Sequence, residues 1–479
     1  MRRSAWLACI VVVLCGRVAV AQDASYQPYP MGERALGMGG AFTSMAGDPI
    51  SSYYNPAGLV YGRSSTVSAS LNVYGMAHRT VTGGGFYLEY EPDPDDPQVA
   101  LPLLVDLEYS EFPPATIPIS TVIVRRIGRR GDDGMRRHAF AWSTLVPRAS
   151  DLGYSLDITS DFDGDPWTMP NEHRIVSRLS DRLMLVGATY AYRLANRFSM
   201  GLSVFCGIRT LSYSYHHTFF NADPSPELRG IQVREIDIAA TVYTGNFRIG
   251  AMWQLTRTWR LGLMVALPSF EIYGEGYYAL RDIETFTGGF ELSEHWDATP
   301  HDVQPLEVRA GISREVAGSY VVSLDVSFYA PASYDRFDGA PGWTGMEWVH
   351  RVERGPIANV SAGGEVIVAQ SWPIRLGFFT DFSAAPEIVP SDQPTVARIH
   401  SFGGTLSVGY TGHGLGINIG VLGSFGTGDA QTVGPVGPDL PTFVPARAQE
   451  RRLYFFISGA REAAERGVGE LIDRIGDDE

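Results

Sequence analysis

The chain has 479 residues, of which 44% are hydrophobic, and its 53 acidic against 38 basic side chains give a formal net charge of −15 at pH 7. This acidic balance argues against nucleic acid as a partner, because phosphate binding depends on basic side chains. The length exceeds that of an ordinary single domain, although one large β-barrel can accommodate it.

Residues 1–21 have the three parts of a secretory signal peptide. Arg2 and Arg3 precede the apolar run 6–15, and a small-residue cleavage site ends at Ala21. We therefore predict export and removal of residues 1–21. A lipoprotein anchor at Cys15 is the alternative, but the preceding Leu14 is large where a small residue is expected.

The mature chain keeps one cysteine, Cys206, so no intrachain disulfide can form. It contains no apolar run of about twenty residues, the length that a membrane-spanning helix needs. If the mature protein lies in a membrane, it crosses with strands.

Residues 31–60 are too rich in glycine for a strand and too interrupted for one helix. Glycines at 37, 39 and 40 permit tight turns and close backbone approach, and Asp48-Pro49 and Asn55-Pro56 are turn starters. Residues 41–46 and 50–54 are each predicted to form a turn or two of helix. The stretch indicates a compact plug; no Gly-Lys-Ser/Thr follows, which disfavours a phosphate cradle.

Two motifs in this stretch, RALGMGGAF and YYNPAGL, resemble the N-terminal hatch of the FadL/TodX-type outer-membrane transporters for hydrophobic compounds. The resemblance implies that residues 22–62 fold into the lumen of a β-barrel, and similar motifs occur in secretion-system barrels. The residues that it implies for gating are Gly37, Gly39, Gly40, Asn55, Pro56 and Ala57.

The rest of the chain alternates between apolar and polar residues with period two. In residues 320–329, for example, Tyr320, Val322 and Leu324 share one face and Val321, Ser323 and Asp325 the other. This period is typical of extended strands between two environments.

Short and long links between these strands alternate, which is typical of outer-membrane barrels with short periplasmic turns and long external loops. Tyrosines and phenylalanines near the strand ends suit interfacial girdles, although a soluble β-protein is the alternative. The predicted fold is all-β: a transmembrane antiparallel barrel of about 14 strands over residues 63–459, with the hatch in its lumen and a short C-terminal helix. The predicted strands are 64–76, 116–127, 136–147, 174–194, 197–219, 232–255, 258–273, 303–315, 319–330, 357–369, 373–383, 398–410, 415–426 and 450–458, and residues 81–90 are a candidate hairpin arm in the first long loop.

Several strand–turn–strand units, among them SDRLMLVGATYAYRLANRFSMGLSV, also resemble the FadL-type barrels. One departure concerns the third strand, where members of that family commonly read Val-Pro-Phe-Gly. Here the chain reads Val146-Pro147-Arg148-Ala149, and an arginine at this place leaves the usual substrate in doubt.

Residues 460–479 extend beyond the last strand with a loose helical stripe. We expect a short periplasmic helix packed on the barrel mouth. The alternative is a docking helix for a periplasmic or surface protein partner.

No enzyme motif is present, neither a Gly-x-Ser-x-Gly elbow nor a His-Glu-x-x-His helix. His216 and His217 are adjacent on a predicted strand, so they point to opposite faces and cannot easily share a metal. We expect no enzymatic activity, and an outer-membrane hydrolase is the weakest alternative.

One acidic loop has the spacing of calcium ligands. Asp161, Asp163 and Asp165 are followed by Glu172 at the twelfth position. Pro166 replaces the expected glycine and no helices flank the loop, so a solvated acidic loop is the competing interpretation. No other cofactor is expected.

Charged residues also fall on the register that faces the lumen, where a buried charge must be paired or hydrated. A pairing network that holds the hatch is one interpretation, and a polar path or an anchor for an acidic headgroup is the other. These residues are Arg193, Arg209, Arg309, Asp325 and Glu365.

The sequence thus predicts a channel in the outer membrane of a Gram-negative-type bacterium, surrounded by outer-membrane lipid. By resemblance, it admits hydrophobic small molecules, long-chain fatty acids or similar compounds, by passive uptake. The alternative function is a non-transporting scaffold of a secretion or surface-assembly system.

Overall fold

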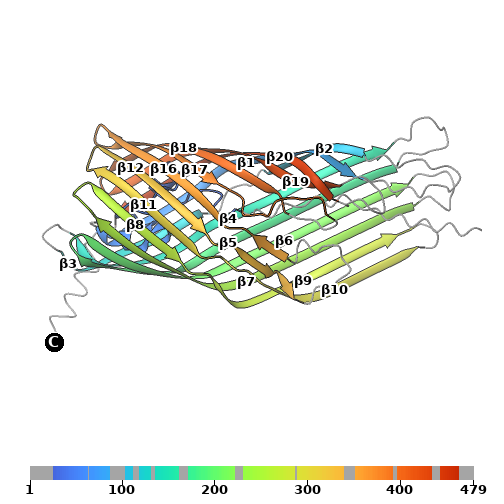
Figure 1. The fold of residues 1–479 in the computed structure, drawn as a ribbon, viewed down its shortest axis with the longest axis horizontal. Coiled ribbons are helices and arrows are strands. Elements are labelled where there is room, and N and C mark those ends of the chain that lie inside the picture. Colours follow the sequence, from blue (N-terminus) through green and yellow to red (C-terminus); the bar gives the residue numbers. More distant parts are fainter. Residues whose placement is uncertain are drawn as a thin grey trace, which may run out of the picture.

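A computed structural model describes residues 25–62, 64–86, 103–111, 118–130, 135–160, 171–221, 230–285, 289–338, 351–391, 396–433 and 443–462. Fourteen antiparallel strands close into one barrel, because β1 pairs with β3 on one side and with β20 on the other (Figure 1). The strands of this ring are β1 (Thr66–Phe86), β3 (Pro118–Arg130), β4 (Arg136–Ser160), β5 (Asn171–Ala195), β6 (Phe198–Asn221), β7 (Gly230–Gln254), β8 (Trp259–Ala266), β11 (Glu307–Val316), β12 (Tyr320–Tyr329), β16 (Ile357–Val368), β17 (Trp372–Asp381), β18 (Arg398–Gly412), β19 (Leu415–Val433) and β20 (Phe443–Glu462).

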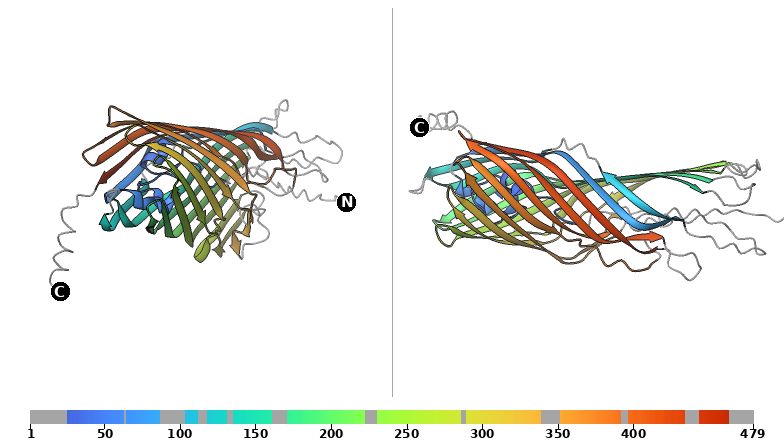
Figure 2. Two further views of the ribbon diagram at one scale, coloured as in Figure 1. Left: turned by 60° about the vertical axis from the view of Figure 1, so that its left-hand side comes forward. Right: turned by 90° about the horizontal axis from the view of Figure 1, so that it is seen from above.

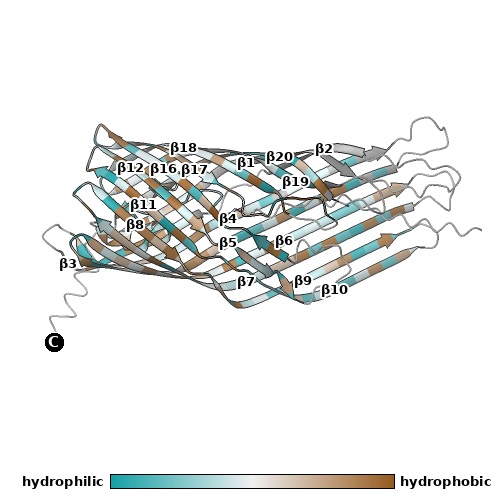
Figure 3. Ribbon diagram, viewed as in Figure 1, coloured by the Kyte–Doolittle hydropathy of each residue, from teal (hydrophilic) through white to brown (hydrophobic). Residues whose placement is uncertain are grey.

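The period-two pattern separates the two faces of the wall as the sequence predicts. Along β12, Val322 and Leu324 are 55% and 47% exposed on the outside, whereas Ser323 and Asp325 are buried inside. Hydrophobic and hydrophilic residues alternate in the same way along β8, β11 and β12 (Figure 3). The apolar outer face and polar inner face are those of a barrel whose outside meets lipid. Among the described residues, no helix is long and apolar enough to span a membrane.

Several strands are longer than predicted, and the links between them are correspondingly shorter. The segment 148–173, predicted as a loop, contains the ends of β4 and β5, whose pairing continues to Ser160 and Asn171. The segment 274–301 likewise contains most of β9 (Phe270–Glu284) and β10 (Phe290–Pro300), which pair with each other. The outer face of these parts is mainly polar, as at Ser155 and Asp157 of β4, whereas apolar residues such as Ile175 and Tyr278 face the lumen. They therefore lack the apolar outer face that predicts a membrane-spanning strand.

The extended parts of β4–β7, β9 and β10 form a wall that projects from one end of the barrel (Figures 1 and 2). The predicted strand 258–273 is divided, because β7 pairs first with β8 and then with β9, and Pro268 lies in the gap. Proline has no N–H for the strand ladder. The predicted start of the following strand at 303 is likewise displaced, to Glu307 in β11.

Short strands also occupy two regions predicted as loops. Residues 81–86 of the candidate hairpin arm at 81–90 are part of β1, which pairs with β2 (Leu103–Glu111), and residues 87–90 lie outside the described residues. In the segment 331–355, β13 (Ala332–Asp335) pairs with β15 (Arg351–Arg354), and β14 (Phe337–Asp338) pairs with β10.

The N-terminal segment, residues 25–62, lies inside the barrel at the end that carries the short links (Figure 2). It contains α1 (Glu33–Gly37), α2 (Ser51–Tyr54) and the 3₁₀ helix η1 (Pro56–Tyr61). The helical turn predicted at 50–54 agrees with α2, whereas residues 41–46 form turns instead of a helix. The side chains of this segment are the largest part of the main hydrophobic core, so the core fills the lumen of the barrel.

Three predictions fall largely outside the described residues. They are the signal peptide at 1–21, the calcium loop at 161–165 and the C-terminal tail, of which only residues 460–462 are described, as the end of β20. Glu172, the fourth predicted calcium ligand, is exposed on β5. Among the described residues, no group of three His, Cys, Asp or Glu side chains is placed to hold a metal ion.

Candidate functional site

Glycines on the inner face of the wall let the backbone of the N-terminal segment approach unusually closely. A Cβ atom added at Gly250 would lie 2.1 Å from Asn55 Oδ1, and one added at Gly363 would lie 2.4 Å from the Met38 carbonyl oxygen. Both distances are far below a van der Waals contact, so any side chain at these positions would displace the segment. We call this set the glycine seat: Gly201, Gly250, Gly262, Gly363 and Gly377.

The Asn-Pro-Ala motif joins α2 to η1 and attaches both to the wall. The Oδ1 atom of Asn55 accepts a hydrogen bond from the Ala57 N–H at 3.1 Å, so Asn55 caps η1, and Pro56 occupies the first turn. The Nδ2 atom donates to the carbonyl oxygens of Thr43 at 2.8 Å and of Ala251, on β7, at 3.0 Å. One buried amide therefore ties two parts of the N-terminal segment to each other and to the barrel.

We expect Asn55→Asp to loosen the N-terminal segment while keeping the cap of η1. A carboxylate can still accept from Ala57 but cannot donate to the Thr43 and Ala251 carbonyls, and each buried acceptor left without a donor costs about 1–3 kcal/mol. Limited proteolysis of the folded protein in detergent should cut Asn55→Asp within residues 25–62 faster than wild type. An equal cutting rate would contradict this role of the amide.

Of the three glycines predicted to take part in gating, Gly37 ends α1, and Gly39 and Gly40 lie in the turn after it. Gly39 and Gly40 have φ of +63° and +80°, the left-handed region that favours glycine, and a Cβ at Gly37 would lie 2.2 Å from Ser407 Oγ. Gly39 also packs against the backbone of β17, where a Cβ would meet the Phe378 nitrogen at 2.7 Å. Glycine is therefore required here for two reasons: the backbone conformation of the turn and the close contact with the barrel wall.

Four of the five predicted lumen-facing charges contact the N-terminal segment. Asp325 accepts hydrogen bonds from the backbone N–H groups of Phe42 and Thr43, both at 2.7 Å. Glu365 binds Arg34 of α1 through two hydrogen bonds, of 3.2 and 2.8 Å. Arg193 places its guanidinium 5.6 Å from the centre of the Tyr61 ring.

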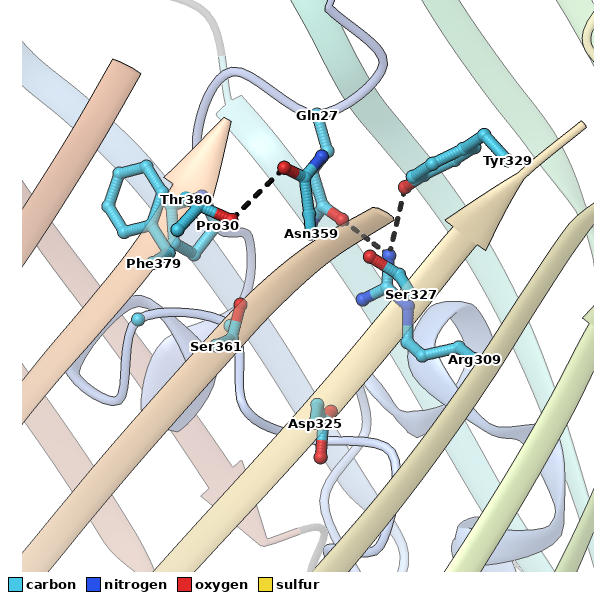
Figure 4. Close-up of a pocket in the computed structure, with 12 residues that line it drawn as sticks. Gln27, Pro30, Arg309, Asp325, Ser327, Tyr329, Asn359, Ser361, Phe379 and Thr380 are labelled. Carbon is cyan, nitrogen blue, oxygen red and sulfur yellow. Dashed lines mark hydrogen bonds between the residues drawn. The ribbon is translucent and has the colours of Figure 1, made fainter. Parts of the chain in front are cut away.

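Arg309 is the fourth. It donates to Gln27 Oε1 at 2.6 Å and to the hydroxyl of Tyr329 at 3.3 Å (Figure 4), and its guanidinium also pairs with Glu307. Figure 4 shows Gln27, Arg309 and Tyr329 between the N-terminal segment and the barrel wall, with Asp325 further along β12. The interpretation of these charges as a network that holds the segment agrees with these contacts.

The fifth charge, Arg209, belongs to a second group of buried charges further from the short-link end. It pairs with Asp181, where its Nε and Nη2 atoms donate at 2.9 and 2.6 Å, and with Asp302. Arg148, which the sequence singled out, is also buried here. We call this group the charged layer: Arg148, Asp181, Arg209, Asp302, Arg336 and Arg354.

Sequence reasoning missed several partners of these charges. Glu307 stands two residues before Arg309 on the same face of β11, so the period-two pattern could have found it. Asp302, Arg336 and Arg354 fall in segments predicted as loops, where no inward face could be assigned.

An apolar belt lines the lumen beyond the charged layer, on the side away from the N-terminal segment. It includes aromatic, branched and small side chains from strands on all sides of the lumen. Its buried members are Val81, Ile175, Leu179, Leu211, Tyr213, Tyr215, Ile238, Ala240, Tyr278, Ala298, Phe337, Ala397, Ile399, Ala430, Ala446 and Ala448.

A cavity of about 500 Å³ lies on the opposite side of the N-terminal segment, at the short-link end. Glu33, Asp48 and Tyr61 of the segment line it, together with Gly318 and Gly414 from the short links. Much smaller spaces remain around the segment itself, such as the one of about 20 Å³ beside Gly39 and Asp325 (Figure 4). The N-terminal segment thus closes the lumen, and the space between the segment and the short-link end is open to solvent.

Glu33 is expected to make the seating of this segment depend on pH. Burial and the nearby Asp48 carboxylate raise the pKa of Glu33 to about 7, and Glu365 acts in the same direction, against Arg375 and Arg34. The protonated form is thus favoured in the seated state. Its stabilising contribution is fully present below the ordinary carboxyl pKa and is lost as the pH rises through about 7.

We expect hydrogen exchange of the backbone amides in residues 33–61, corrected for intrinsic rates, to be slower at pH 5 than at pH 8. Glu33→Gln should reduce this difference. Because burial also raises the pKa of Asp48, the double variant Glu33→Gln/Asp48→Asn should abolish it. Equal pH dependence in wild type and the double variant would show that other groups control the seating.

Solved structures of known channels share this fold. A FadL homologue from Pseudomonas aeruginosa is 14% identical to this chain, with a TM-score of 0.59. The toluene transporter TodX from P. putida is also 14% identical, with a TM-score of 0.54. Each alignment covers 91% of this chain and 99% of the other. The toluene transporter TbuX from Ralstonia pickettii is 15% identical over the same shares, with a TM-score of 0.50. No protein-family model and no curated protein matches the sequence. The FadL-type resemblance is confirmed at the level of the fold.

Proposed function

We propose that this protein is an outer-membrane channel for passive uptake of hydrophobic small molecules, with the N-terminal segment as its hatch. One observation carries the proposal: a buried segment fills the lumen at one end, with an apolar belt on one side and an open cavity on the other. The shared fold supports it, because the similar structures are described as a FadL homologue and toluene transporters.

The long-link end faces the outside in this proposal, and the short-link end faces the periplasm. A hydrophobic molecule leaves water for the apolar belt, where burial of apolar surface is favourable by about 25 cal/mol per Å². It then passes the hatch through a side or periplasmic exit that a small hatch movement opens. The hatch suits such a movement because it is held by hydrogen bonds and ion pairs, which can exchange, and by packing against glycines.

A disulfide between hatch and wall tests whether uptake needs this movement. The Oγ atoms of Ser44 in the hatch and Ser323 on β12 are 3.4 Å apart. In a Cys206→Ser background, Ser44→Cys/Ser323→Cys should bridge without large backbone shifts. We expect oxidised protein in liposomes to lose uptake of both oleate and toluene, and reduction to restore it.

The matched control is a disulfide between two wall strands. Ser70 on β1 and Ser120 on β3 have their Oγ atoms 2.7 Å apart and do not involve the hatch. Ser70→Cys/Ser120→Cys should transport equally in oxidised and reduced form. Unchanged uptake through the oxidised Ser44–Ser323 variant would overturn the gating role of the hatch.

The scaffold alternative gains no support from Arg148, because its side chain is buried in the lumen and is not available to a protein partner. The other two features that would favour a scaffold are the C-terminal tail and the acidic loops, and both lie mainly outside the described residues. Copurification of a stoichiometric protein partner from outer membranes would favour it.

A further inference from the structure

The cavity at the short-link end has an acidic lining. Its volume of about 500 Å³ is within the range of small-molecule sites. Two of the residues that line it are basic, Arg34 and Arg375. Five are acidic: Glu33, Asp48, Glu315, Glu365 and Glu462. The lining therefore has an excess of negative charge.

Two of the five carboxylates already have cationic partners. Glu365 pairs with both Arg34 and Arg375, and Glu315 pairs with Arg260. Both basic residues of the lining are thus occupied by Glu365. Glu462 is exposed, so water can solvate its carboxylate. The acidic residues that are both buried and without a cationic partner among the described residues are Glu33 and Asp48.

Glu33 is the more isolated of the two. It is 8% exposed, and its carboxylate makes no hydrogen bond or ion pair with any residue that the structure describes. A Cβ atom added at Gly416, which also lines the cavity, would lie 3.1 Å from Glu33 Oε1. The carboxylate therefore lies against β19 at the cavity. A buried carboxylate is normally hydrogen-bonded, so this one has unused acceptor capacity.

Asp48 supplies a second carboxylate from another part of the hatch. It is 6% exposed, and its Oδ1 atom accepts a hydrogen bond from the Ile50 N–H at 3.0 Å. Its Oδ2 atom accepts none from the described residues. The charge of Asp48 helps to raise the pKa of Glu33, which shows that the two carboxylates are near each other. We call Glu33 and Asp48 the acid pair.

The same cavity also offers apolar surface. Pro49 and Tyr61 of the hatch line it, together with Val321 and Leu415 of the wall. An ammonium group on an alkyl stem fits this combination, because its three N–H donors can serve two carboxylates while the stem contacts apolar side chains. A divalent metal ion fits less well, since the described residues contain no group of three His, Cys, Asp or Glu side chains placed to hold one.

We propose that the acid pair binds a primary ammonium group whose alkyl stem lies in the cavity, and that the bound group holds the hatch in its seat. The ammonium would join Glu33, the first residue of α1, to Asp48, which precedes α2. The chain contains no lysine, so none of its own side chains supplies this group. The two sources are a free alkylamine and a lysine of another protein. The inference does not depend on which compounds the channel carries.

The test compares butylammonium with 1-butanol, which have the same chain length and differ in the headgroup. Binding of each to the full-length protein in mild detergent is measured by titration calorimetry at pH 8. We expect wild type to bind butylammonium roughly tenfold or more tighter than butanol, as charge-assisted hydrogen bonds predict.

The preference should weaken roughly tenfold or more at pH 5. The pKa of about 7 leaves Glu33 protonated in the empty site at pH 5, whereas the ammonium keeps its charge at both pH values. The other charged groups that act on the acid pair are Arg34, Arg375 and Glu365, which are paired with one another. We therefore assign the pH dependence to the acid pair.

Glu33→Gln/Asp48→Asn should remove the preference for butylammonium at pH 8. Glu462→Gln is the matched control, because it removes a negative charge from the same cavity at an exposed position. It should weaken binding about twofold or less, since exposed charges are screened. Heat-modifiable migration on gels checks that each variant is folded.

Hydrogen exchange tests the effect on the hatch. Saturating butylammonium at pH 8 should slow exchange of the backbone amides in residues 33–61 of wild type and leave the double variant unchanged. Butylammonium binding without slower exchange would overturn the proposed role in holding the hatch.

The peptide acetyl-Gly-Lys-Gly-amide distinguishes the two sources of the ammonium group. Tighter binding of the peptide than of butylammonium would assign the site to a lysine of another protein. Binding of butylammonium alone would assign it to a free amine.

Two further results would overturn the ammonium site while the channel function stands. One is equal binding of butylammonium and butanol by wild type, or an unchanged preference in the double variant. The other is tighter binding of Mg²⁺ than of butylammonium, which would replace the ammonium by a metal ion.

Discussion

Replacing Glu365 with glutamine is expected to release α1 from the barrel wall and open the channel to ions. Glu365 is buried and pairs with both Arg34 of the hatch and Arg375 of β17, whose Nε atom lies 2.5 Å from Glu365 Oε2. Glutamine keeps the shape of the side chain but removes the negative charge that Arg34 and Arg375 share. Breaking a buried ion pair in this way costs about 3–5 kcal/mol.

Planar-bilayer conductance and proteolysis of the hatch measure this effect, because a displaced hatch no longer blocks the lumen and becomes accessible to protease. Asp151→Asn is the control: it removes an equally well-formed ion pair, with Arg178 at 2.9 Å, from an exposed site. An exposed pair contributes at most about 1 kcal/mol, so the control should behave as wild type. A closed, protease-resistant Glu365→Gln channel would show that this ion pair is not needed to hold the hatch.

Gly363→Ala is expected to displace the turn after α1, whereas Gly364→Ala is expected to be silent. These glycines are adjacent on β16, but Gly363 faces the hatch and Gly364 faces outward. The new Cβ at 363 would lie 2.4 Å from the Met38 carbonyl oxygen and 2.7 Å from its Cβ, whereas the one at 364 has its nearest neighbour at 3.8 Å. The clash is with backbone, which a rotamer change cannot relieve.

Overpacking of this kind costs about 1–3 kcal/mol. The cost should fall on the hatch more than on the barrel, because the hatch has fewer backbone bonds to the wall than the strands have to one another. Hydrogen exchange of residues 33–61 should therefore be faster in Gly363→Ala, while the strands keep wild-type protection. The same exchange rates in both variants would mean that the glycine seat does not hold the hatch.

The strands of the barrel were predictable where one face meets lipid. Val322, Leu324 and Val326 alternate with Ser323 and Asp325, and this contrast identified β12 nearly to the residue. The prediction failed where the outer face becomes polar, as in residues 148–160 of β4, because such a strand has no lipid-facing apolar side to distinguish it from a polar loop.

The site was predictable in part for the same reason. Arg309, Asp325 and Glu365 were assigned to the lumen from their register alone, and each contacts the hatch. The register of Arg148 could not be assigned in this way, because the bulge before it reverses which residues face inward. Asp302 and Arg336 come from links between strands, whose direction the sequence does not specify.

The sequence by itself determined the class of fold, the number of barrel strands and the composition of the hatch. These follow from local patterns, since the period of two, the turn residues and the glycines each act within a few neighbouring positions. Only the tertiary structure decided which charges pair, that glycines from five different strands form one seat, and that Arg148 has no hydrogen-bonding partner among the described residues. These depend on the closure of the barrel and on the register of each strand against the next, which bring together residues as distant as Arg34 and Glu365.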